Sequence, residues 1–195
     1  GILTDVTLDG SGSNDPDGDT LIYTWTGSFG TVSGMSPTVQ LGIDEHTIEL
    51  TVDDGNGGIS SDTVVVKVQD TTAPDFTFTQ LSSELSPPNH KMVLVATVSN
   101  VTDLVDSSPV VSVTVTSNQT TNGKGDGNTD DYDWEVIQNG VVWNIWVRAE
   151  RSGKSEGRVY SISVNVSDSS GNQDTSSSTV TVPHDEGKGG GNGKK

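Results

Sequence analysis

Apolar residues alternate with polar ones along almost the whole chain, and this alternation constrains the fold more than any other feature. Ile162, Val164 and Val166, for example, are separated by single polar residues. A period of two places the apolar side chains on one face of an extended strand. No segment of ten residues carries a convincing helical stripe of apolar positions. The sequence therefore predicts an all-β protein in which antiparallel strands form sandwiches with one wet face per sheet.

The alternation is interrupted once in a way that predicts two domains. A valine-rich strand ends near Asp70, and the following Pro74 cannot donate a ladder hydrogen bond, so we place a boundary between residues 70 and 71. The expected units are residues 1–70 and 71–185, and the glycine-rich residues 186–195 are expected to be a flexible tail. The predicted strands are residues 6–11, 20–27, 38–41, 46–53, 61–69, 75–80, 91–99, 109–118, 132–138, 141–150, 157–167 and 174–183.

Composition excludes several classes of partner and of chemistry. Among 195 residues, 27 acids face 10 bases, and the net charge of −17 repels phosphate and anionic lipid, so no nucleic-acid partner is expected. No apolar run approaches the roughly 20 residues that span a bilayer, which argues against membrane insertion. The chain has no Cys, no Gly-x-Ser-x-Gly elbow and no His-Glu-x-x-His pair. We therefore do not expect an enzyme.

One loop of the first unit has the composition of a calcium site. Asp15, Asp17 and Asp19 place carboxylates at positions i, i+2 and i+4, with Gly18 at the bend. Such crowding suits Ca²⁺, which takes roughly six to eight oxygen ligands. Because the rest of an EF-hand is absent, further ligands must come from elsewhere, and Asp54, at the end of another strand, is the best donor. The alternative is a solvated turn rich in Asp and Gly.

Four runs of the first unit carry a resemblance to a known family. They are VTLDGSGS (residues 6–13), DPDGD (15–19), LIYTW (21–25) and IELTVDDGNG (48–57). Together they resemble a PKD domain, the polycystic-kidney-disease type of immunoglobulin-like sandwich. The resemblance implies an extracellular accessory domain that often binds calcium, and it places Asp15, Asp17 and Asp54 on family ligand positions. Trp25 is expected to be a core residue of the central strand. The family's first strand would lie before Leu8, and residues 1–5 retain little of it.

The second unit contains another acidic loop. Asp126, Asn128 and Asp130 repeat the oxygen-donor spacing of i, i+2 and i+4, which suits Ca²⁺ better than Mg²⁺ because a flexible loop does not impose octahedral geometry. A solvated hairpin loop is the alternative. Asp168 begins the turn before the last predicted strand, where it can add a metal ligand or simply form an Asx turn.

Segments of the second unit resemble a further family. SPPNHKM (residues 86–92), RAERSG (148–153), GRVY (157–160) and VPHD (182–185) are similar to an immunoglobulin-like module of bacterial secreted proteins. This resemblance implies a fold and an extracellular or cell-surface location more than an activity. Arg148, Glu150 and Arg151 are expected to form an ion-pair cluster, and a solvent-facing version contributes only about 0–1 kcal/mol per pair.

These observations predict two tandem immunoglobulin-like β-sandwiches that bind Ca²⁺ and catalyse no reaction. The expected role is a spacer, stalk or interaction module of a larger bacterial secreted or surface protein. The alternative function is a carbohydrate- or matrix-binding module, in which Trp146 and Trp134 contact a polysaccharide or an extracellular protein. Trp146 is the stronger candidate of the two because it alternates out of phase with the apolar Trp143.

Overall fold

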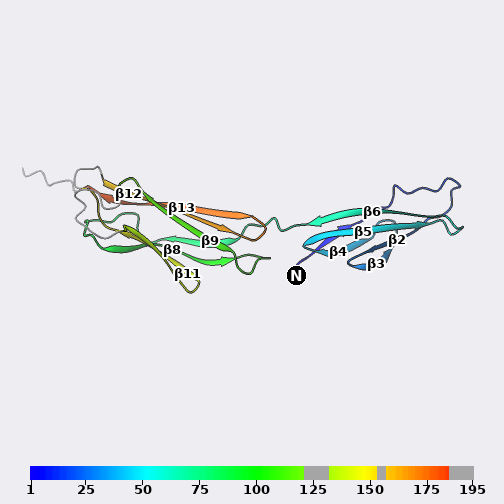
Figure 1. The fold of residues 1–195 in the computed structure, drawn as a ribbon, viewed down its shortest axis with the longest axis horizontal. Coiled ribbons are helices and arrows are strands. Elements are labelled where there is room, and N and C mark those ends of the chain that lie inside the picture. Colours follow the sequence, from blue (N-terminus) through cyan, green and yellow to red (C-terminus); the bar gives the residue numbers. More distant parts are fainter. Residues whose placement is uncertain (121–131, 153–156, 185–195) are drawn as a thin grey trace, which may run out of the picture. The chain divides into compact units, whose positions relative to one another are not determined.

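A computed structural model describes residues 1–120, 132–152 and 157–184 (Figure 1). All the regular structure in these residues is β-strand, which confirms the predicted all-β class. The chain divides into two compact units, Gly1–Thr71 and Thr72–Lys195, and each unit contains two sheets in the manner of an immunoglobulin-like β-sandwich. Among the described residues there is no helix long and apolar enough to cross a membrane.

The first unit contains six strands in two antiparallel sheets. They are β1 (Leu3–Thr7), β2 (Ile22–Gly27), β3 (Gly30–Ser33), β4 (Thr38–Gly42), β5 (Asp44–Asp53) and β6 (Ile59–Val68). β1 pairs with β4, and the other sheet has the order β3-β2-β5-β6. The buried core residues are Leu8, Trp25, Val39, Leu41 and Ile48. Trp25 thus lies in the core as predicted, and its Nε1–H donates to the Gly34 carbonyl at 3.0 Å.

The two sheets of the first unit differ in width, and the wider sheet is not fully covered. Ile48 of β5 and Val64 of β6 are register partners in neighbouring antiparallel strands, so their side chains point to the same face. Ile48 is 0% exposed, whereas Val64 is 43% exposed. The opposing sheet has only two strands. The core therefore closes over β5 and leaves the inner face of β6 half open.

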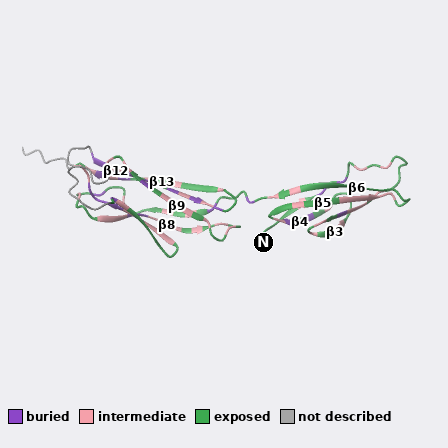
Figure 2. Ribbon diagram, viewed as in Figure 1, coloured by how far each residue is buried: buried purple, intermediate pink, exposed green. Residues whose placement is uncertain are grey.

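The described part of the second unit contains seven strands. They are β7 (Asp75–Gln80), β8 (Met92–Thr102), β9 (Val110–Ser117), β10 (Trp134–Asn139), β11 (Val142–Arg148), β12 (Gly157–Ser167) and β13 (Gln173–Pro183). One antiparallel sheet has the order β10-β11-β8-β7 and the other the order β13-β12-β9. Along β12, the inward residues Tyr160, Ile162, Val164 and Val166 are at most 1% exposed and alternate with less buried ones, as the sequence period predicts (Figure 2).

The sequence misplaced one strand and missed another. Residues 6–11 were expected to form the first strand, but β1 ends at Thr7, although the N–H of Leu8 still donates to the Pro37 carbonyl at 2.9 Å. The apolar period continues through Leu8 because that side chain is buried without belonging to the ladder. β3 was not predicted, because Val32 is its only apolar residue and it forms a hairpin with β2.

The unequal cover of β5 and β6 has a measurable consequence for stability. Ile48→Ala is expected to lower the free energy of unfolding by about 2–5 kcal/mol, because it leaves a cavity in a closed core. Val64→Ala is expected to cost less than about 1 kcal/mol, because much of that side chain already contacts water. Urea denaturation of the two variants measures the difference, and equal costs would contradict an open inner face of β6.

Candidate functional site

The Asp15 loop closes through its own backbone. The Asp15 Oδ1 accepts the N–H groups of Asp17 at 2.8 Å and of Asp19 at 3.2 Å. Gly18 has a φ of +83°, a left-handed conformation that glycine adopts without steric cost. The carboxylates of Asp17 and Asp19 lie on the surface. The loop thus has the predicted tight bend, and backbone donors satisfy part of the Asp15 charge.

The Asp54 turn lies beside this loop. Asp54 Oδ1 accepts the N–H groups of Asn56 at 2.7 Å and of Gly58 at 2.9 Å, and these hydrogen bonds lower the pKa of Asp54. Any side chain at Gly58 would collide with that carboxylate. Asn56 joins the two loops, because its Nδ2 donates to Asp19 Oδ2 at 2.9 Å.

The structure brings Asp15 and Asp54 to one cavity of about 380 Å³, which both residues line. The four predicted ligands of this unit, which all lie in the described part of the chain, are Asp15, Asp17, Asp19 and Asp54. No three of their carboxylates place oxygens within 4.8 Å of one another, so the structure does not gather them into one ligand set. Calcium binding at these loops therefore stays a prediction. The second predicted set, Asp126, Asn128 and Asp130, lies outside the described residues.

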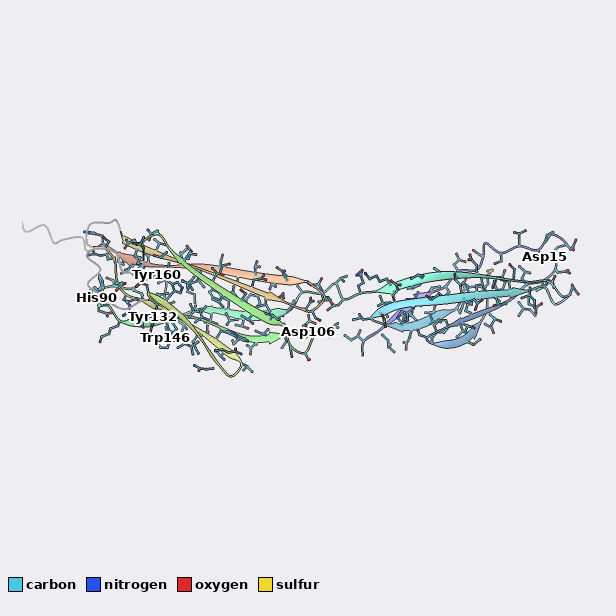
Figure 3. All side chains as sticks on the ribbon, viewed as in Figure 1. Asp15, His90, Asp106, Tyr132, Trp146 and Tyr160 are labelled. Carbon is cyan, nitrogen blue, oxygen red and sulfur yellow. The ribbon has the colours of Figure 1, made fainter. Side chains whose placement is uncertain are left out.

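One end of the second unit, which Asp106 marks in Figure 3, holds acidic residues from two different loops. Asp106, labelled there, accepts N–H groups from Ser108 at 2.9 Å and from Ser169 at 2.8 Å, and both bonds lower its pKa. Its Oδ2 thereby ties the loop after β8 to the turn after β12. The sequence pointed to Asp168 in that turn but not to the loop that faces it.

Asp168 and Asp103 also lie at this end of the second unit. Asp168 forms an Asx turn in which Asn172 donates its backbone N–H at 2.8 Å and its Nδ2 at 2.7 Å. Burial raises the pKa of Asp168, but these hydrogen bonds outweigh it and the pKa is lowered. An oxygen of Asp103 lies within 4.8 Å of an oxygen of Asp168. The Oδ2 of Asp103 is buried without a hydrogen-bond partner among the described residues.

The two tryptophans proposed for ligand binding lie on opposite faces of their sheet. Trp134 points inward with its register partner Val147, packs against the core and makes an edge-on contact with the Tyr160 ring at 6.4 Å. Trp146 is half-buried on the outer face, opposite Glu135 (Figure 3). Of the two, only Trp146 presents its ring on the outside of the sandwich, and a role for it in binding stays a prediction.

The sequence missed a network of buried charges in the second unit. Arg158 of β12 is 1% exposed, and Asp133 and Glu150 are 0% exposed. Arg158 donates its Nη1 to Glu150 Oε1 at 3.1 Å and its Nη2 to Asp133 Oδ2. Its guanidinium also lies 4.7 Å from the centre of the Tyr160 ring. The signal was present in the sequence, because Arg158 occupies the same strand face as the inward residues of β12.

Further contacts surround this network. The Tyr160 hydroxyl donates to the Arg148 carbonyl at 2.9 Å, and burial raises the pKa of Tyr160. Arg148 in turn donates its Nη1 to the His90 carbonyl at 3.0 Å. Arg148 and Glu150, which were expected to belong to one ion-pair cluster, are both buried, with Nε and Oε2 3.9 Å apart. They are buried because they follow an inward-facing strand end, where Glu150 also pairs with Arg158.

Comparisons with known proteins do not identify the chain further. No protein-family model and no curated protein matches it. Among solved structures it is similar to "PcdhgB3 EC1-4", with 13% identity and a TM-score of 0.39 over 86% of this chain and 41% of that one. "Protocadherin gammaB7 EC3-6" gives 11% identity and a TM-score of 0.37 over 83% and 39%, respectively. A chimeric titin Z1Z2 gives 19% identity and a TM-score of 0.31 over 93% of this chain and 88% of that one. The chain thus spans about two fifths of each protocadherin, and scores of this size do not place it in any of these families.

The buried network generates a prediction about stability. Arg158→Met is expected to destabilise the protein by about 3–5 kcal/mol, because it removes the arginine that donates to two buried carboxylates. Adding Asp133→Asn and Glu150→Gln to the same chain is expected to recover most of that loss. The matched control is Arg151→Met, because Arg151 is a half-buried arginine whose Nε donates to the Pro183 carbonyl. Chemical denaturation measures the free energy of unfolding of these three variants. If the triple variant does not recover the stability lost in Arg158→Met, a role based on charge is contradicted.

Proposed function

We propose that this chain is a non-catalytic pair of immunoglobulin-like domains from a bacterial secreted or surface protein, and that Ca²⁺ bound at its acidic loops stiffens them. The observation that carries the proposal is the Asp103–Asp168 pair. Two carboxylates with oxygens within 4.8 Å, one of those groups holding a buried and unsatisfied Oδ2, repel each other unless a cation lies between them. Oxygen-only donors favour a hard cation, and a loop-built site suits Ca²⁺.

The first unit supports the proposal independently. Asp15 and Asp54 line one cavity, and Asn56 joins their loops through Asp19. The resemblance to PKD domains implies ligands at these positions. Twelve acidic side chains and a single base, Lys67, give the unit a net charge of −11, so a bound dication reduces repulsion within the fold. In this proposal the chain serves as a spacer or interaction module whose loops are ordered at extracellular calcium concentrations.

The test is calorimetric titration of the EDTA-stripped chain with CaCl₂, together with thermal melting. Dissociation constants of about 10⁻⁴–10⁻³ M are expected, as for other extracellular modules. Ten times that concentration stabilises each site by about 1.4 kcal/mol. The response to MgCl₂ is expected to be smaller, because Mg²⁺ demands stricter geometry. The absence of both heat and a melting shift would refute calcium binding.

Substitutions separate the two sites. Asp103→Asn is expected to weaken the calcium response of the second unit and to raise its stability in EDTA, because it relieves repulsion with Asp168. Asp15→Asn is expected to weaken only the response of the first unit. Glu135→Gln and Glu49→Gln, which change exposed acids elsewhere in each unit, are matched controls. If Asp103→Asn destabilises the calcium-free protein, the repulsion on which the proposal depends is absent.

A second candidate function is binding of a polysaccharide or an extracellular protein through Trp146. The observation that favours it is the position of this half-buried indole on the outer face of its sheet. Aromatic rings with one free side stack on sugar rings and anchor protein contacts. Affinity electrophoresis in gels cast with chitin, cellulose or collagen distinguishes the two functions. Retardation that disappears in Trp146→Ala favours binding, and migration that no gel retards leaves the spacer function alone.

A further inference from the structure

The first unit has an open seam between β1 and β6. Two cavities, of about 380 and 270 Å³, lie along it and share Leu50 and Asp62 in their linings. Residues of β1, including Val6, and residues of β6, including Val64, line the second cavity together. The first cavity ends at the loop of Asp15, which Figure 3 labels. The two cavities therefore adjoin each other along the inner face of β6, and we call them together the seam.

Both walls of the seam are strand edges. β1 pairs with β4 on one side and, within the described residues, with no strand on the other. β6 pairs with β5 and is the last strand of its sheet. An edge strand directs half of its backbone N–H and C=O groups away from its sheet, where they are available to another strand. The seam thus has free backbone hydrogen-bonding groups on the strands that line it.

The floor of the seam is apolar. Val64 and Val66 of β6 line the second cavity together with Leu50 of β5. Val64 and Val66 point inward, because their register partners on β5 are the inward residues Ile48 and His46. Val64 stays 43% exposed in this position. An added strand with apolar residues at every second position would cover these side chains. It would also widen the β1–β4 sheet from two strands to three, which is the usual minimum for a stable sheet.

The charge of the seam selects the chemistry of that strand. Asp9 and Asp62 both line the cavity between β1 and β6, and Asp62 projects from the inner face of β6 opposite Leu50. The unit carries twelve acidic side chains and one basic side chain. A second copy of this acidic unit would be repelled, whereas a lysine or arginine placed between Asp9 and Asp62 would be attracted.

We propose that the seam binds an extended segment of a basic partner protein as an added β-strand. The segment carries apolar residues at alternate positions, which cover Val64 and Leu50, and a lysine or arginine that pairs with Asp62. Its backbone pairs with the free edge of β1, so main-chain hydrogen bonds give affinity and the alternating side chains give specificity. This inference goes beyond calcium binding and does not depend on it, because Asp62 and Val64 are not calcium ligands in the proposed function.

The test uses the whole 195-residue chain and a fluorescein-labelled peptide of nine residues. Valine occupies positions 1, 3, 7 and 9 of the peptide, lysine the central position 5 and threonine the remaining positions, so that the lysine lies on the same face of the strand as the valines. Fluorescence anisotropy in EDTA, and again in CaCl₂, is expected to show saturable binding that weakens as salt is added. A peptide with the same composition but four consecutive valines, and one with glutamate in place of lysine, are both expected to bind at least about tenfold more weakly.

Variants of neighbouring residues on β6 locate the bound peptide. Val64→Lys is expected to weaken binding at least about tenfold, because it places a charge on the apolar floor. Val65→Lys makes the same change of charge on the outer face of the same strand, where Val65 is 58% exposed, and is expected to leave affinity within about twofold. Asp62→Asn is expected to weaken binding about fivefold and to reduce its salt dependence. Glu49→Gln, the control, is expected to change neither the affinity nor the salt dependence.

Three results would overturn the proposal. One is a flat anisotropy curve for the alternating peptide at millimolar protein, and another is equal binding of the three peptides. The third is sedimentation of the chain as a dimer that Val64→Lys dissociates, which would assign the seam to a second copy. Circular dichroism spectra of the variants establish that they are folded, and Asp62→Asn, which removes a charge without changing shape, tests the proposal even if Val64→Lys does not fold.

Discussion

Each strand of this protein is apolar on one face only, so each sheet depends on a second sheet to cover that face. In the second unit the cover is nearly complete, and the inward residues of β12 from Tyr160 to Val166 are at most 1% exposed. In the first unit a two-stranded sheet opposes a four-stranded one. The same burial rule therefore gives a closed core in one unit and an open seam in the other. Fully burying one Val side chain contributes about 1.5–3 kcal/mol, so Val64, which is 43% exposed, lacks part of that contribution.

The sequence predicted features that depend on the period of two and missed features that depend on topology. The alternation predicted the class and the inward face of β12, and the resemblance to an immunoglobulin-like sandwich predicted the position of Trp25. It also placed Arg158 on that inward face, but an arginine is interpreted as exposed unless its partners are known. Those partners, Asp133 and Glu150, come from segments that the sheet pairing brings together. No local pattern contains that information.

The acidic loops show the same division. The i, i+2, i+4 spacing of Asp15 predicted a tight loop, and the loop is present with the expected glycine. Asp103, a single aspartate after β8, has no such pattern, and only the packing of the β8–β9 loop against the Asp168 turn reveals it. Much of the crowded negative charge is met locally, because Asx turns direct backbone N–H groups at Asp15, Asp54 and Asp168. A cation at these loops would therefore add to an existing fold and would not create it.

The two units offset acidic charge by different means, and this difference connects the proposals for the first unit. In the second unit, Arg148 and Arg158 lie beside Asp133 and Glu150, so two bases balance two acids at one end of the sandwich. The first unit has only Lys67 and cannot build such a network. Three means of offsetting the acidic charge of the first unit remain: backbone N–H groups, cations from solvent, and basic side chains of a partner. Screening in physiological salt extends over about 8 Å and does little for groups that face one another in a cavity. In these two proposals the loops near Asp15 and Asp54 hold an ion, whereas the seam near Asp62, where a carboxylate borders an apolar floor and a free strand edge, binds a basic strand.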